Sequence, residues 1–147
     1  MKSLYKLQPL ILEWAKEKNL LLPENAPKQK LKLIEECGEL ASAIIKNNIE
    51  LQKDAIGDVF VVLVILAEQT DSNLDFDFTG NIVLEEEPYE IIKGICYVLN
   101  CVIGELNSLY DVSKLLGLDL TECANIAWNE IKDRTGKTVD GTFIKDK

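Results

Sequence analysis

Two short acidic segments contain the side chains with the clearest potential for chemistry. The first carries Glu35, Glu36 and Glu39, and the second carries Asp54 and Asp58. At roughly 100° per residue in an α-helix, the three glutamates fall within one arc of about 100°, and the two aspartates are one turn apart. Only a short turn separates the two predicted helices, so they should pack antiparallel and bring both sets of carboxylates together. An oxygen-only cluster favours a hard cation, Mg²⁺, with Mn²⁺ as a substitute.

Asp58 is the acidic residue whose position most clearly demands a partner. Residues 59–67, which follow it, are all apolar, so this helix should be surrounded by protein. A carboxylate flanked by Val61, Val62 and Ile65 loses several kcal/mol of hydration unless it is paired or bound to metal. Because a buried carboxylate must find some partner, Asp58 could instead cap a neighbouring helix or bond a Trp or Tyr side chain.

The glutamates also have a simpler explanation. They lie opposite an apolar stripe of the same helix, and an ordinary solvated face would show the same pattern. The stripe consists of Leu33, Cys37, Leu40 and Ile44. The lysines that precede the glutamates, Lys28, Lys30 and Lys32, can likewise be read as surface charge.

Composition excludes several classes of function. The chain has 147 residues, of which 47% are hydrophobic, as in a globular protein and unlike a disordered one. Its net charge of −9 argues against a partner that is a nucleic-acid polymer, since phosphate backbones demand clustered Lys and Arg. The sequence contains no histidine, which excludes Ser-His-Asp and Cys-His catalysis, His-ligated zinc and Glu-x-x-His di-iron sites.

Other features favour a soluble, cytoplasmic protein. The cysteines Cys37, Cys96, Cys101 and Cys123 show no C-x-x-C spacing, and we expect them to be small buried hydrophobes without disulfides. The first residues lack signal-peptide architecture. The longest apolar run, 59–67, is far too short to span a membrane, so no membrane partner is expected.

Apolar periodicity predicts an all-α bundle of four to five helices in one domain, 1–147, with its core at about 28–137. Residues 71–87 should form an irregular acidic connection, although 82–84 could be a short extended piece. Residues 135–147 should form a polar tail, and no convincing strand is found. Helices are expected at about 4–18, 28–46, 50–69 and 88–116, and a last one, capped by Asp119 or Thr121, should end before Gly136.

Three segments resemble, in order, the sequence pattern of the MazG-like, all-α nucleoside triphosphate pyrophosphatases. Residues 31–41 (LKLIEECGELA) resemble the E-E-x-x-E half of the family motif, and residues 54–59 (DAIGDV) resemble its later E-x-x-D half. Residues 128–137 (WNEIKDRTGK) are similar to the Asn, Lys and Arg segment that follows. There is one departure: the family's second Glu would stand at Ala55, and Asp54, on a similar face, is the candidate substitute.

The resemblance implies a Mg²⁺-dependent hydrolase that cleaves a nucleoside triphosphate between the α- and β-phosphates, releasing monophosphate and pyrophosphate. Glu36, Glu39 and Asp58, with Asp54, would hold the metal, and Glu35 would orient or deprotonate the attacking water. This chemistry needs no histidine, because metal and carboxylates can supply both charge neutralisation and water placement.

Substrate-binding candidates lie outside the acidic segments. Lys132 and Arg134 are candidates for contacting phosphate. Asn129 shares a helical face with Asn125 and Lys132, although a plain solvated stripe would look the same. Trp14 could stack on the base, but its spacing with Ile11 and Ala15 is equally that of a core residue.

Several functions remain compatible with these residues. Among enzymes, the chain could be a dedicated dUTP or dCTP pyrophosphatase or an enzyme of broad tolerance. Ala55 and the long acidic connection also allow a catalytically weakened MazG-like regulatory or interaction module. A helical adaptor without any site is the third possibility. In each case we expect a homodimer or homotetramer, since the apolar third helix needs cover and the family commonly self-associates.

Overall fold

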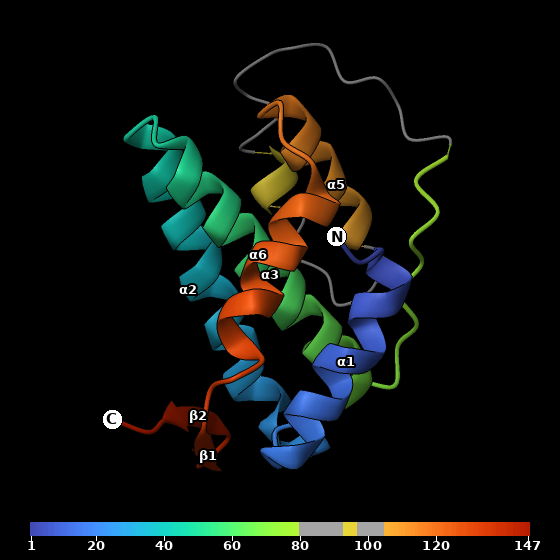
Figure 1. Ribbon diagram of the computed structural model, residues 1–147, viewed down its shortest axis with the longest axis vertical. Coiled ribbons are helices and arrows are strands. Elements are labelled where there is room, and N and C mark those ends of the chain that lie inside the picture. The colour runs from blue at the N-terminus through green and yellow to red at the C-terminus, as the bar shows by residue number, and fades with distance from the viewer. Residues whose placement is uncertain (80–92, 97–104) are drawn as a thin grey trace.

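The computed structural model describes residues 1–79, 93–96 and 105–147. These residues are mostly helical, which confirms the all-α prediction (Figure 1). The helices are α1 (Leu4–Glu17), the 3₁₀ turn η1 (Pro23–Asn25), α2 (Ala26–Ile45), α3 (Ile49–Gln69), α5 (Glu105–Leu115) and α6 (Leu120–Ile131), and residues 93–96 are also helical. Within the described residues, no helix is long and apolar enough to cross a membrane.

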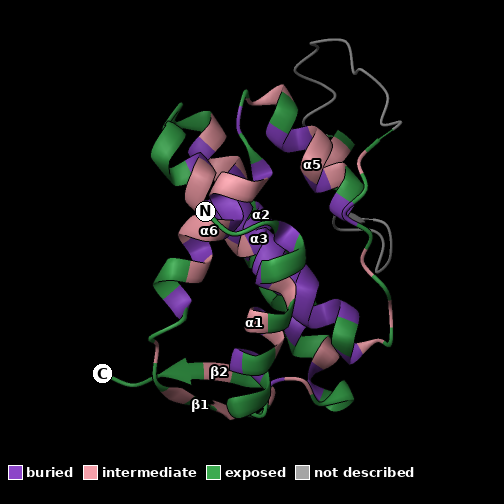
Figure 2. Ribbon diagram, turned by 45° about the vertical axis from the view of Figure 1, so that its right-hand side comes forward, coloured by how far each residue is buried: buried purple, intermediate pink, exposed green. Residues whose placement is uncertain are grey.

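Helix α3 forms the centre of the bundle. It packs against α2, α6, α1 and α5, and from Ala55 to Ala67 only Asp58 is not fully buried. Figure 2 shows these buried residues concentrated along α3. The other helices therefore cover its apolar surface, as burial of nonpolar area requires. The prediction that α3 is surrounded by protein is confirmed, but the expectation that it needs cover from a second copy is wrong, because this chain's own helices supply it.

The turn between α2 and α3 brings the two acidic segments together. Asn47 adopts a positive φ of 50°, which ends α2, and Asn48 begins α3 by accepting a hydrogen bond on Oδ1 from the Leu51 amide at 3.1 Å. The helices then run back along one another, as the short connection predicted. One end of the pair is thus fixed locally by two asparagines.

Most predicted helix bounds agree with the structure within two residues. The Asp119 cap is confirmed, since its Oδ1 accepts a hydrogen bond from the Glu122 amide at 2.8 Å. The predicted fourth helix is confirmed at 93–96 and 105–115, whereas 88–92 and 97–104 lie outside the described residues. The connection is irregular over 71–79, as predicted, and 80–87 lies outside the described residues.

The C-terminal tail corrects the sequence reading. Instead of an irregular segment, it forms an antiparallel hairpin of β1 (Gly136–Val139) and β2 (Thr142–Lys145). Asp140 and Gly141 form its two-residue loop, with φ values of 48° and 79°. An Asp-Gly pair between short β-favouring runs is a strong hairpin signal, because both loop positions need positive φ. Asp140-Gly141 is therefore the sequence feature that encodes the hairpin.

The cysteines only partly match expectation. Cys37 and Cys123 are buried, and burial raises the pKa of their thiols to about 11 and about 12, so both are inert at neutral pH. Cys96 is exposed, contrary to expectation, because helical spacing alone did not show which face meets solvent. All three are free thiols, and Cys101 lies outside the described residues.

Candidate functional site

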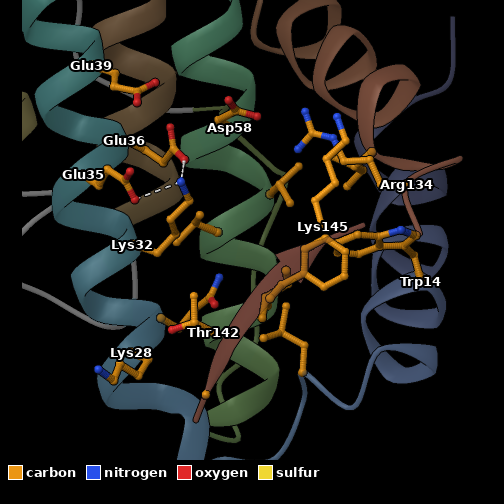
Figure 3. Close-up of a pocket in the computed structure, with 18 residues that line it drawn as sticks. Trp14, Lys28, Lys32, Glu35, Glu36, Glu39, Asp58, Arg134, Thr142 and Lys145 are labelled. Carbon is orange, nitrogen blue, oxygen red and sulfur yellow. Dashed lines mark hydrogen bonds and ion pairs between the residues drawn. The ribbon is translucent and has the colours of Figure 1, made fainter. Parts of the chain in front are cut away.

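A cavity of about 470 Å³ opens between α2, α3, the C-terminal end of α6 and the hairpin. Acidic side chains from α2 and α3 line it together with basic side chains from α2, from β2 and from Arg134, which follows α6, and aromatic rings close one end (Figure 3). Its charged and aromatic lining residues are Trp14, Lys28, Lys32, Glu35, Glu36, Glu39, Asp58, Arg134, Phe143 and Lys145. The structure thus brings four of the five predicted acidic residues into one cavity.

Glu36 is the most deeply buried carboxylate of this cavity. The residue is only 3% exposed, and its Oε1 lies 2.6 Å from the Lys32 ammonium. Its second oxygen, Oε2, is buried and has no hydrogen-bond partner among the described residues. Burial raises the pKa of Glu36, and the neighbouring Glu39 and Glu35 carboxylates add to this effect, while Lys32 opposes it. A buried carboxylate with one unpaired oxygen retains the capacity to ligate a metal cation.

Asp58 faces the same cavity from α3. Burial raises the pKa of its carboxyl group to about 7, and the negative charges of Glu36, Asp54 and Glu130 contribute, while Arg134 opposes them. Within the described residues its carboxylate makes no hydrogen bond, so it neither caps a helix there nor bonds a Trp or Tyr. The simple structural explanations considered for Asp58 therefore have no support in this arrangement.

The backbone beside Asp58 is held by unusually close packing. A Cβ atom at Gly57 would overlap the Cys123 carbonyl oxygen and would lie 2.9 Å from the Ala127 Cβ. Helix α6 therefore approaches α3 at a point where only glycine fits. This contact fixes Asp58 relative to the end of α6, from which Arg134 follows.

Asp54 and Ala55 show what the departure from the family motif means structurally. Ala55 is 3% exposed and packs in the core, so this position does not face the cavity. Asp54 does not line the cavity either, but its Oδ1 is buried without a partner and its charge acts on Asp58. The Asp54 carboxylate is therefore close enough to raise the pKa of Asp58, although it does not line the cavity.

Basic side chains face the carboxylates across the cavity. In Figure 3, Asp58 lies between the glutamates of α2 and the side chains of Arg134 and Lys145. Arg134 also pairs with Glu130, at 3.2 Å between Nη2 and Oε2. In the described part of the chain, Lys145 has no ion-pair partner. The sequence analysis does not identify Lys145, because it predicts a polar tail without strands for this segment.

The other predicted substrate-binding residues lie elsewhere. Asn129 and Lys132 are exposed, do not line the cavity, and bond one another at 3.2 Å. Asn125 bonds the backbone of Lys2 at the N-terminus. Of the C-terminal candidates, the structure therefore brings only Arg134 to the carboxylates.

Aromatic rings form the far end of the cavity. Trp14 is 8% exposed and packs in the core, yet it also lines the cavity, and its indole N–H is buried without a partner. Its ring meets that of Phe143 edge to face, with centroids 5.2 Å apart. The hairpin is further anchored because the Thr138 hydroxyl donates to the Lys18 carbonyl oxygen at 2.6 Å. Trp14 is thus a core residue, as its spacing predicts, and its place in the cavity lining leaves base stacking as a prediction.

The chemistry of the donor set fits a divalent cation, although the carboxylates do not converge on one point. Among the described residues, no three His, Cys, Asp or Glu side chains converge closely enough to hold a metal ion. The fit instead rests on the chemistry of the donors: buried oxygens of Glu36 and Asp54 lack partners, and Asp58 carries no hydrogen bond there. Hard oxygen donors of this kind suit Mg²⁺ or Mn²⁺.

Comparison with known proteins points to one family. The family model of the MazG nucleotide pyrophosphohydrolase domain matches residues 26–84, which include all of α2 and α3. An uncharacterized 18.2 kDa protein in the rep-hol intergenic region of Haemophilus phage HP1 (strain HP1c1) is 48% identical over 69 residues. That match covers 47% of this chain and 42% of the phage protein, and no solved structure matches the chain. The resemblance seen in the acidic segments is thereby confirmed: residues 26–84 match the MazG nucleotide pyrophosphohydrolase domain, and the match covers less than half of the chain.

Proposed function

We propose that this protein is a Mg²⁺-dependent pyrophosphohydrolase that converts a nucleoside triphosphate, or a deoxy form, to the monophosphate and pyrophosphate. One observation carries the proposal: the carboxylates of α2 and α3, in the segment that matches the MazG domain, share a cavity with Arg134, which follows α6, and with Lys145 of the hairpin. Hydrolysis of a triphosphate requires both carboxylates and basic side chains. Basic groups and a cation neutralise the phosphate oxygens, while a carboxylate remains free to act on water.

Glu36, Glu39 and Asp58 would hold the metal, with Asp54 behind them. The cation would neutralise charge on the phosphates, which repels the acidic wall when no cation intervenes. Two observations support this role. Glu36 is buried and, although its Oε1 pairs with Lys32, its Oε2 has no hydrogen-bond partner among the described residues. Asp58 is half-buried and makes no hydrogen bond within the same residues.

The remaining cavity residues have distinct roles in this proposal. Glu35 is exposed at the cavity edge, where it can orient water and accept its proton. Arg134 and Lys145 would bind phosphate oxygens, Arg134 through its two-pronged guanidinium. Trp14 and Phe143 offer an apolar wall for the base at the opposite end from the carboxylates.

A binding or regulatory module is the second candidate. It is favoured by Asp54, which stands in for the family's glutamate but does not line the cavity. A site with one carboxylate fewer would hold metal and nucleotide but turn over slowly. Metal-dependent nucleotide binding without product formation distinguishes this function from the enzyme.

The direct test is to incubate the protein with a panel of ribo- and deoxyribonucleoside triphosphates, with Mg²⁺ or with EDTA, and resolve products by ion exchange. The proposal requires monophosphate plus pyrophosphate, lost in EDTA and in Asp58→Asn. Diphosphate plus orthophosphate would assign a different scissile bond. No product from any nucleotide, despite metal-dependent binding, would leave the binding module as the function.

A further inference from the structure

The ammonium of Lys32 lies between two carboxylates that face the cavity. Its Nζ is 2.6 Å from Glu36 Oε1 and 2.9 Å from Glu35 Oε2 (Figure 3). The three residues occupy one face of α2, at spacings of three and four. The Lys32 ammonium thus lies next to the Glu36 carboxylate, in the position that a metal ion bound to Glu36 would occupy.

The two partners of the Lys32–Glu36 ion pair differ in their exposure to solvent. The Glu36 side chain is 4% exposed, whereas that of Lys32 is 45% exposed. Glu36 cannot leave its site without moving the core, but Lys32 can withdraw along its flexible four-carbon stem. The ion pair therefore has one fixed partner and one movable partner.

A dication and the Lys32 ammonium cannot both remain against Glu36 without strong repulsion. We infer that Lys32 is a built-in counter-cation, which balances Glu36 and Glu35 before metal arrives and turns to the triphosphate when the metal takes its place. The inference rests on the proposed function and deepens it, since it assigns Lys32 as a positioning residue for both metal and phosphate.

The cavity offers the released ammonium a suitable destination. Lys32 lines the same cavity as Arg134 and Lys145, the two residues proposed to bind phosphate oxygens. An ammonium displaced from Glu36 would add a third positive charge beside the phosphates. Metal loading would thereby prepare the cavity for its anionic substrate, because it frees a cation at the moment the carboxylates are neutralised.

The first arm of the test measures metal binding without any nucleotide. Mn²⁺ is titrated at pH 8 into wild type, Lys32→Met and Lys32→Gln, and free Mn²⁺ is followed by electron paramagnetic resonance. Removing the internal cation should tighten the Mn²⁺ dissociation constant about tenfold in both variants, by the size of a near charge–charge interaction. Lys30→Met is the matched control: Lys30 is on the same helix, exposed and outside the cavity, so its loss should change affinity by less than about twofold.

The second arm measures phosphate recognition with the Mn²⁺ complex of inorganic triphosphate, a probe independent of base and sugar. Lys32→Met should bind this complex about tenfold more weakly than wild type, as expected when one charge-assisted contact is lost. A merely structural Lys32 would weaken both metal and triphosphate binding, so opposite signs in the two arms are diagnostic. Circular dichroism establishes that each variant is folded.

Two results overturn the inference alone. The first is that the Lys32 variants bind Mn²⁺ no more tightly than Lys30→Met does. The second is that Lys32→Met binds the Mn²⁺-triphosphate complex as tightly as wild type does. Absence of Mn²⁺ binding to wild type overturns the inference and the metal site of the proposed function together. If no nucleotide in the panel yields monophosphate and pyrophosphate, while both binding measurements give the expected results, only the proposed reaction is overturned.

Discussion

The indole ring of Trp14, in the first helix, meets the phenyl ring of Phe143, in the last strand, edge to face at 5.2 Å between centroids. This contact joins α1 to β2 at one end of the cavity that the acidic residues line. Both rings lie outside residues 26–84, the segment matched by the MazG domain. The domain thus contributes the acidic half of the cavity, and the flanking segments contribute its aromatic and part of its basic lining.

Phe143→Ala should weaken nucleotide binding without affecting the metal. Loss of the ring removes an aromatic contact of about 1 kcal/mol and loosens the hairpin that presents Lys145. We expect KM for the best nucleotide to rise about tenfold, while Mn²⁺ affinity in the absence of nucleotide stays unchanged. Ile144→Ala is the control, since Ile144 is an exposed neighbour on the same strand that does not line the cavity. Equal KM effects from both variants would remove Phe143 from the substrate wall.

Asp58→Asn should abolish catalysis while leaving the fold intact. The amide keeps the size of the carboxylate but not the charge that holds a cation, so kcat/KM should fall by roughly 1,000-fold. In EDTA at pH 8 the variant should unfold at a higher temperature than wild type, because repulsion with Glu36 and Asp54 is relieved. Retained activity would mean that Asp58 is not part of the reacting centre.

The raised pKa of Asp58 predicts how the metal-free protein responds to pH. The carboxyl has an ordinary value of 3.8 and a value of about 7 in the folded state, so the folded protein binds its proton more tightly than the unfolded chain. The stabilising effect is complete below about pH 4 and is lost as pH rises toward and through 7, lowering the free energy of unfolding by a few kcal/mol at most.

Urea unfolding in EDTA from pH 4 to pH 8 measures this trend. The difference between wild type and Asp58→Asn isolates the contribution of Asp58 from that of other groups. It should grow in favour of the variant across the window, and Mg²⁺ at pH 8 should restore wild-type stability. A difference that is constant with pH would contradict the assignment.

The placement of the acidic residues could largely be predicted from the pattern of apolar residues along α2 and α3. The apolar run after Asp58 indicated a helix inside a bundle, because it continues a longer predicted helix, and that placed one carboxylate toward the interior. The asparagine turn then fixed α2 against α3, so the glutamates and Asp58 had to meet. Here each local preference agrees with the global fold.

The missed features depend on information that periodicity does not contain. The hairpin was encoded by Asp140 and Gly141, a turn signal and not a periodic one. Without the hairpin, Lys145 could not be placed opposite the carboxylates. The contact of Lys32 with Glu36 depends on which side-chain conformation is adopted, and Lys before Glu is the weaker order of such pairs on a helix.

Self-association should involve the outer face of α2 instead of α3. Leu31, Ile34 and Ile45 are 59%, 55% and 85% exposed on this helix, an apolar stripe that a second copy could cover. We expect a dimer or tetramer by light scattering at micromolar concentration, and Ile34→Glu should shift it toward monomer. Lys30→Glu, on the same helix, is the charge control. A wild-type monomer under these conditions would refute the prediction.

Two glycines on neighbouring helices should respond in opposite directions to the same substitution. Gly57→Ala places a Cβ against the Cys123 carbonyl and Ala127, so α3 and α6 must separate, which should cost about 1–3 kcal/mol in unfolding free energy. Gly38→Ala meets nothing within 4 Å on an exposed face of α2 and should stabilise the protein by up to about 1 kcal/mol through helix propensity.

Urea unfolding of both variants measures this contrast in stability, and KM is a second measurement. Because Gly57 sets the approach of α6, its substitution should move Arg134 away from Asp58 and raise KM, whereas Gly38→Ala should leave KM unchanged. If Gly57→Ala were neutral in both stability and KM, the close contact between α3 and α6 could not be what positions the basic wall of the cavity. Opposite shifts in stability, with a KM effect confined to Gly57→Ala, would tie the packing of these two helices directly to the geometry of the site.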